Sequence, residues 1–304
     1  ISTDIGASLA NYDAVTQYAF SAKLGGIFYL KDLEGDTNES LSNSTLNASL
    51  SHSFDQTLRY NGSLSFAWQP EPNYSNGIAN SRRDGDYIYV YVSSSLSKAW
   101  TTRYSRTERL ALSINWNGSY CDREYGNNEF SNFVMAGAEY AVAQNTSATL
   151  RVGPQFKHVD NYGTKTYPSA EFGLNHRMSD RFSLGMFVRY SNEATNTYVP
   201  QTGASYYSNE TWRVGLTSTM KVTHRVSLNA GVNLISSDYS RPSSSSTDTK
   251  TLTFNATAGV KMMLTNVLAL TAQYSYTNGS YSGYNFPMPS YNRNVFSFGM
   301  NYSF

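Results

Sequence analysis

The sequence repeats one pattern from end to end: apolar side chains occupy every second position of short segments, with small or polar residues between them. The closing segment VFSFGMNYSF places Phe296, Phe298, Met300, Tyr302 and Phe304 in one phase, and Ser, Gly and Asn in the other. A period of two is that of a β-strand whose side chains alternate between two faces. Each such segment therefore predicts a strand with one apolar and one polar face.

Fourteen segments between residues 14 and 304 follow this pattern, and none shows the period of a helix. Very short connections, such as Asp55-Gln56, Thr101-Thr102 and Thr223-His224, alternate with longer polar ones, of which 70–86 is the longest. The repeating unit is an antiparallel hairpin with a tight base and a long tip. Twelve or sixteen strands remain open alternatives if the segments before residue 55 are assigned differently.

Alternation alone does not separate a β-sandwich, a soluble barrel and a membrane barrel, because all three have one apolar face per strand. The regular order of short and long connections favours a membrane barrel, as do Tyr and Trp residues near strand ends, such as Trp68, Trp100 and Trp212. We therefore predict an all-β chain with a single transmembrane antiparallel up-and-down β-barrel of about 14 strands over residues 14–304. Residues 1–13 are predicted to form a short periplasmic N-terminal segment, with both termini at the tight-turn end.

Composition excludes several other classes of protein. Charged residues are 15% of the chain and the net charge is +1, which gives no indication of nucleic-acid binding. No window approaches 18 consecutive apolar residues, so no spanning helix is expected. Cys121 is the single cysteine, and no cluster of ligand residues predicts a metal or cofactor. No serine and histidine stand at a spacing that indicates a hydrolase, so we do not expect an enzyme.

The text F-x-F-x-M-x-Y-x-F, ending on Phe304, resembles the C-terminal strand of bacterial outer-membrane proteins. The hairpin texts LNHRMSDRFSL and LSHSFDQTLRYNGSL are similar to those of the putative beta-barrel porin families. This resemblance implies a location in the bacterial outer membrane, in contact with its lipid and lipopolysaccharide. It also implies that the barrel assembly machinery reads the C-terminal signature. It does not identify a solute.

If the apolar face meets lipid, the polar face lines the barrel, and strand parity assigns each charge to one side. Three acidic residues fall on the inner face: Glu139, Glu171 and Glu193. The basic residues predicted to line the lumen are Lys23, Arg59, Arg109, Arg151, Lys157, Arg177, Arg189, Arg213, Lys221, Lys261 and Arg293. These charges either solvate and balance the interior or attract anions.

Tyr87, Tyr89 and Tyr91 alternate with Ile88, Val90 and Val92, so strand parity places these tyrosines on the inner face. Their rings could stack on sugar faces, or they could pack beneath the connection 70–86. Two functions follow from these features. The first is a porin-like channel with a basic, polar lumen for diffusion of small anionic or saccharide solutes. The alternative is a non-conducting barrel that anchors or caps a larger envelope or polysaccharide or fibre export assembly, with an envelope protein as its partner.

Overall fold

The structure is a computed structural model, which describes residues 2–28, 39–40, 44–70, 74–75, 78–79, 86–101, 109–123, 127–193, 207–240, 249–265, 267–283 and 290–302. All regular structure in these residues is β-strand. None of the described residues forms a helix long and apolar enough to cross a membrane.

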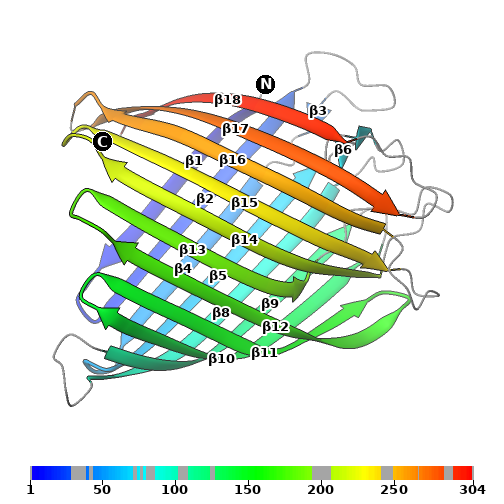
Figure 1. Cartoon of the computed structure of the whole chain (residues 1–304), viewed down its shortest axis with the longest axis horizontal. Helices are drawn as coiled ribbons and strands as arrows, with labels where there is room; N and C mark the ends of the chain where they lie inside the picture. Colours follow the sequence, from blue (N-terminus) through cyan, green and yellow to red (C-terminus); the bar gives the residue numbers. More distant parts are fainter. Residues whose placement is uncertain are drawn as a thin grey trace.

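Fifteen strands form one antiparallel sheet in chain order, and each pairs with the next along the sequence (Figure 1). They are β1 (Ser2–Tyr12), β2 (Thr16–Phe28), β4 (Ser44–Ser53), β5 (Leu58–Pro70), β8 (Asp86–Thr101), β9 (Arg109–Arg123), β10 (Glu129–Ala143), β11 (Thr146–Val159), β12 (Gly163–Arg177), β13 (Phe182–Asn192), β14 (Ser208–Lys221), β15 (Val226–Ser240), β16 (Thr249–Met263), β17 (Leu268–Gly283) and β18 (Tyr291–Tyr302). The short β3 (Glu39–Ser40) pairs with β2, and β6 (Tyr74–Ser75) pairs with β7 (Ile78–Ala79).

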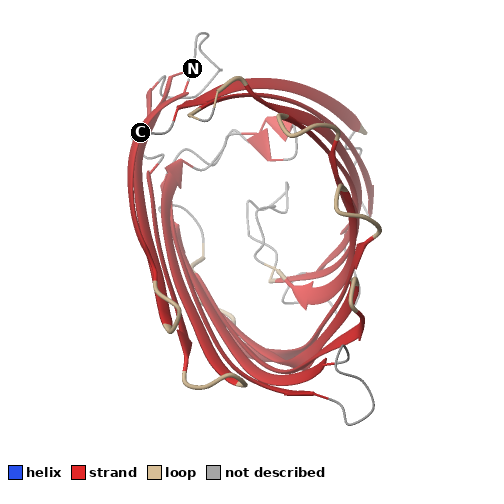
Figure 2. Ribbon diagram, turned by 90° about the vertical axis from the view of Figure 1, so that its left-hand side faces the viewer, coloured by secondary structure: helices blue, strands red, loops and turns tan. Residues whose placement is uncertain are grey.

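The sheet curls into a nearly complete ring, and the two ends of the chain lie beside the opening (Figure 2). Among the described residues, β1 pairs only with β2, and β18 pairs only with β17. Strand β1 ends at Tyr12, beside the turn 13–15, and β18 ends at Tyr302, opposite Leu268 and beside the turn 264–267. Both edge strands therefore run in the same direction, toward the tight-turn end.

The first strand corrects two predictions. Ser2–Tyr12, which was expected to be a segment outside the sheet, is a strand paired along its whole length with β2. It brings the number of strands in the sheet to fifteen, in line with the prediction of about 14. Ser2 lies opposite Ile27, so β1 begins at the end away from the tight turns and the termini are not on one side. The pattern is weak here because Ala7 and Asn11 share the phase of Ile5 and Leu9, which leaves too few large apolar residues to reveal the alternation.

The tight turns share a hydrogen bond that explains their related sequences. In four of them, a side-chain oxygen accepts the backbone N–H of the residue three positions later. The pairs are Asp55 with Leu58 at 2.7 Å, Ser179 with Phe182 at 3.1 Å, Thr223 with Val226 at 3.0 Å and Thr265 with Leu268 at 3.0 Å. Short polar side chains of this kind close turns by bonding the local backbone. The recurring Asp, Ser or Thr thus marks the base of these four hairpins.

One predicted turn is placed differently. Thr101-Thr102 was expected to join two strands directly, whereas β8 includes Thr101 and β9 begins at Arg109. The connection therefore spans 102–108, which lies outside the described residues. The two threonines resembled a turn because they follow Trp100, the last large apolar residue in the alternating pattern of this strand.

Candidate functional site

The polar face of the sheet is the concave one. Tyr89 and Tyr91 on β8 interact electrostatically with Arg189 on β13, which lies five strands further along the sheet. Side chains so far apart in the sheet can interact only across the space that it encloses. The apolar phase faces outward, where Val232 and Leu234 are 43% and 44% exposed.

The strand register places each predicted lining residue relative to this inner face. All eleven basic residues lie in the polar phase, as do Glu139, Glu171 and Glu193. Tyr89 and Tyr91 are inward and half-buried, while the backbone of Tyr87 has the same phase. On the opposite face of β18, Phe296, Phe298 and Met300 are 69%, 83% and 70% exposed. Phe304 and the side chain of Tyr302 lie outside what the structure describes.

Two arginines on the inner face share one carboxylate. Arg151 on β11 and Arg189 on β13 each approach Glu171 on the intervening β12, with N–O distances of 3.4 Å. Both arginine side chains are partly exposed, at 46% and 39%. One negative charge cannot neutralise two positive ones, so this point of the wall has a net positive charge beside Tyr89 and Tyr91.

Closer to the end opposite the tight turns, the wall of the barrel contains a polar network that is largely buried. We define the wall network as Glu129, Gln155, Lys157, Asn192, Glu193 and Arg213. Lys157 is 1% exposed. Its Nζ donates to Asn192 Oδ1 at 3.0 Å and to the backbone oxygen of Glu193 at 2.8 Å, and it lies 3.4 Å from Glu129 Oε2.

Two further contacts complete the wall network. Arg213 Nε donates to Glu193 Oε1 at 2.6 Å, and its Nη2 bonds the other carboxylate oxygen. The amide of Gln155 bonds both backbone groups of Asn192, donating to its oxygen at 2.5 Å and accepting from its N–H at 2.9 Å. A side chain of β11 thus makes the pair of bonds that a neighbouring strand would make with β13.

The Gln155 side chain takes the place of a neighbouring strand at the point where β12 separates from β13. Their pairing stops at Ala170 and Tyr190, and two residues beyond lies Pro168, which faces Pro154 on β11. Proline has no N–H to donate to a ladder, and it is normally confined to edges or irregular points of a sheet. With β12 displaced, the side chains of β11 contact β13 directly.

Sequence reasoning missed three members of this arrangement. Glu129 could have been found, because extending the alternation of 134–142 toward the N-terminus puts it in phase with Glu139. It adds a fourth inward acidic residue to the three that were predicted. Gln155 and Asn192 gave no signal, because nothing in the alternation shows that strands two apart in the sheet meet. The two prolines were the only indication of an irregular wall.

Among the described residues, no group of three or more His, Cys, Asp or Glu side chains is arranged to hold a metal ion. The inner wall is instead suited to non-covalent contact with charged or hydroxylated solutes. Its guanidinium groups offer fixed forks of N–H donors for oxyanions, and its tyrosines offer apolar rings with a polar tip.

A family model described as an outer membrane protein beta-barrel domain matches residues 148–304, which is just over half of the chain. The chain belongs to this family. It therefore lies in the bacterial outer membrane, with the apolar face of its strands toward lipid and the polar face toward the lumen. In such barrels the tight turns lie on the periplasmic side.

Solved structures show the same fold at low sequence identity. FpvA of P. aeruginosa, solved with heterologous pyoverdines, is 11% identical, with a TM-score of 0.53 over 100% of this chain and 52% of its own. The FrpB iron transporter of Neisseria meningitidis is 8% identical, with a TM-score of 0.51 over 92% and 52%. The chain thus spans about half the length of these proteins. No curated protein matches the sequence.

The outer-membrane barrel has a pair of aromatic residues on its lipid-facing side that resembles part of an aromatic girdle. Tyr190 and Trp212 lie side by side on β13 and β14, with ring centroids 4.8 Å apart. The Tyr190 hydroxyl donates to Glu210 at 3.0 Å, one outward position further from the tight turns. Amphipathic rings favour the membrane–water boundary, and a carboxylate favours the water beyond it. This pair therefore marks the outer boundary of the lipid-facing band.

Proposed function

We propose that this outer-membrane barrel is a porin-like diffusion channel whose lumen favours small anionic or saccharide solutes. The observation that supports it most is the pair Arg151 and Arg189, which share Glu171. Across the lumen, Arg189 interacts with Tyr89 and Tyr91, and Arg151 interacts with Tyr91. Positive charge in a water-filled lumen with low-dielectric walls raises the local concentration of anions. The tyrosine rings opposite supply a surface on which sugar faces can stack.

Reversal-potential measurements on the purified barrel in planar bilayers test this proposal. A salt gradient should give an anion-selective potential at low ionic strength, and selectivity should fall as salt rises because screening shortens to about 8 Å at physiological ionic strength. The double variant Arg151→Glu/Arg189→Glu should shift selectivity toward cations. The matched control Lys98→Glu/Lys250→Glu reverses two charges of the same sign on the outer face and should change the selectivity little. A wild-type pore that prefers cations would refute the charge argument.

One observation favours the alternative, a barrel that does not conduct and anchors or caps an envelope assembly. Four of the six members of the wall network are buried, and Gln155, Lys157 and Asn192 are only 0%, 1% and 2% exposed, whereas side chains lining open water are exposed. In that case the inner polar groups hold the barrel closed or bind a partner chain from a polysaccharide or fibre export system. A barrel that inserts into bilayers and passes no current would support this alternative.

Partners of the barrel are also proposals. The surrounding lipid and lipopolysaccharide follow from its location. The exposed stripe of Phe296, Phe298 and Met300 supports recognition of the C-terminal strand by the barrel assembly machinery.

A further inference from the structure

The periplasmic mouth of the barrel has a regular arrangement of inner-face residues from β12 to β17. Basic side chains occur on alternate strands, with Arg177 on β12, Lys221 on β14 and Lys261 on β16. The strands between and beside them present hydroxyl groups: Ser183 on β13, Ser227 on β15 and Thr271 on β17. We call these six residues the mouth arc.

The register links the members of the arc in two groups, one on β12 and β13 and one from β14 to β17, and Ser183 of the first group lies opposite Thr219, two residues from Lys221. Arg177 pairs with Ser183, Lys221 pairs with Ser227, Ser227 pairs with Lys261, and Lys261 pairs with Thr271. Neighbouring strands lie about 4.8 Å apart, so the backbones of successive basic residues are roughly 10 Å apart. Lysine and arginine side chains are long enough to converge on one ligand over that span. Each pair of cations therefore has a hydroxyl donor between its members.

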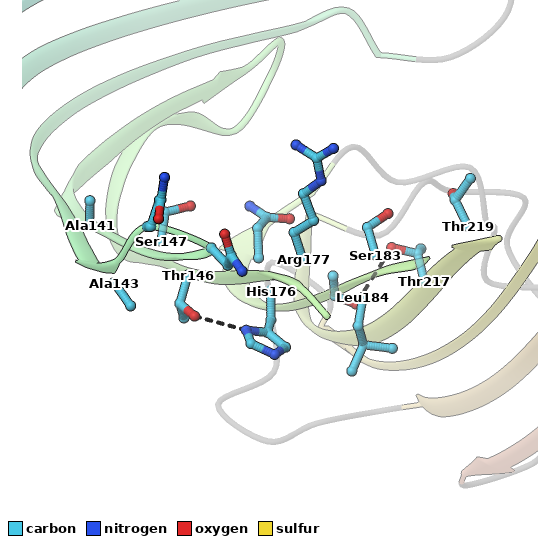
Figure 3. Close-up of a pocket in the computed structure, with 14 residues that line it drawn as sticks. Ala141, Ala143, Thr146, Ser147, His176, Arg177, Ser183, Leu184, Thr217 and Thr219 are labelled. Carbon is cyan, nitrogen blue, oxygen red and sulfur yellow. Dashed lines mark hydrogen bonds between the residues drawn. The ribbon is translucent and has the colours of Figure 1, made fainter. Parts of the chain in front are cut away.

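The recess beside Arg177 gives part of the arc a concave shape. A cavity of about 370 Å³ is lined there by Ser147, Asn175, Arg177, Ser183, Thr217 and Thr219, among others. Figure 3 shows the side chains of Arg177, Ser183 and Thr219 on one side of the sheet, while His176 and Leu184 point to the other. The recess therefore opens on the inner face and offers N–H and O–H donors.

The charge balance at this end of the barrel is positive. The segments 175–183, 217–229 and 259–265 with 267–273 contain five basic side chains, Arg177, Arg181, Lys221, Arg225 and Lys261, and one acidic side chain, Asp180. Asp180 Oδ1 accepts from Arg177 Nη2 at 3.0 Å, but it is 96% exposed, so water screens this pair. The other N–H groups of the guanidinium remain to bind a ligand.

We propose that the mouth arc is an anion-binding site for small multivalent oxyanions, meaning solutes that bear phosphate or several carboxylate groups. Charge-assisted bonds from guanidinium and ammonium groups are the strong ones for such ligands. The hydroxyls between them supply the additional donors that several oxyanion oxygens need. This site lies at the tight-turn end, apart from Arg151 and Arg189, and binding there does not require that the barrel conducts.

Equilibrium dialysis of inorganic pyrophosphate against the folded barrel in detergent micelles tests the proposal. The wild type should bind pyrophosphate, with an affinity that falls as salt rises. Lys221→Gln/Lys261→Gln should weaken binding at least tenfold, and Arg177→Gln should also weaken it. The matched control Lys98→Gln/Lys250→Gln removes the same charge from the outer face and should change affinity less than twofold.

Heat modifiability on gels identifies variants that have folded, so loss of binding is scored on folded barrels alone. The proposal is overturned if the wild type does not bind pyrophosphate, or if the outer-face control weakens binding as much as the arc variant. Dialysis measures binding without measuring current. A barrel that does not conduct can therefore still bind pyrophosphate, and a barrel that does not bind pyrophosphate can still conduct.

Discussion

Replacing Lys157 with methionine should destabilise the barrel far more than removing any exposed charge. Lys157 is 1% exposed and Glu129 is 5% exposed, so the substitution removes a cation from beside a buried carboxylate. It also removes the donor to Asn192 Oδ1 and to the backbone oxygen of Glu193. Breaking a buried ion pair from one side costs about 3–5 kcal/mol. We expect the free energy of unfolding to fall by that amount.

Urea unfolding of the barrel in lipid vesicles, followed by tryptophan fluorescence, measures this change. Arg177→Met is the matched control, because its partner Asp180 is 96% exposed and such surface pairs contribute only ~0–1 kcal/mol. The double variant Lys157→Met/Glu129→Met removes both charges, and apolar replacement of a whole buried pair is often neutral. It should recover most of the loss, giving a coupling energy that a double-mutant cycle reads directly.

The reasoning fails if Lys157→Met costs no more than Arg177→Met, because Lys157 would then have water as an alternative partner. It also fails if the double variant is as unstable as the sum of the two single variants. That outcome would mean that Glu129 and Lys157 act independently of each other.

Two further predictions concern the strand faces and the turns. Val232→Lys should lower the free energy of unfolding in vesicles by ~2–4 kcal/mol because it places a charge against lipid. Gln273→Lys, on the inner face, should change this free energy little. Equal effects of the two substitutions would contradict the assignment of the strand faces. Backbone N–H bonds, chiefly from Thr57, hold the pKa of Asp55 below its usual 3.8. The carboxylate should therefore stabilise the turn fully above pH 3.8, and this stabilisation should be lost as the pH falls through the lowered pKa that Asp55 has in the folded barrel. Amide exchange at Leu58 should accelerate in that acid range in the wild type, and Asp55→Asn should remove the pH dependence.

Much of the fold was predictable because alternation records directly which face each side chain takes. The segment expected from Val226 is β15, which begins at that residue, and the charge phases assigned there match the observed register. Strand ends were less predictable, because β15 continues to Ser240, beyond the last large apolar residue. Outside the lipid-facing band a strand needs no apolar side chains, so its sequence no longer marks it.

The wall network could not have been predicted from the same signal. Alternation gives the face of each residue but not the curvature of the sheet, and curvature decides whether Gln155 meets Asn192. That contact depends on β12 leaving β13, which depends in turn on two prolines that face each other across a strand pair. Pro154 and Pro168 are fourteen positions apart, so only the hairpin register shows that they pair.

The paired prolines also divide the barrel into parts of unequal local stability. Beyond Ala170, the strand segment 163–169 has β11 on one side and no described ladder with β13 on the other. Opening such a segment breaks fewer hydrogen bonds than opening a strand held on both sides, so its amides should exchange through local fluctuations rather than through global unfolding. The tip of this hairpin can thus fluctuate while the remaining strands stay paired. The contacts of Gln155 and Lys157 with Asn192 and Glu193 then hold this end of the wall together where the ladder between β12 and β13 does not.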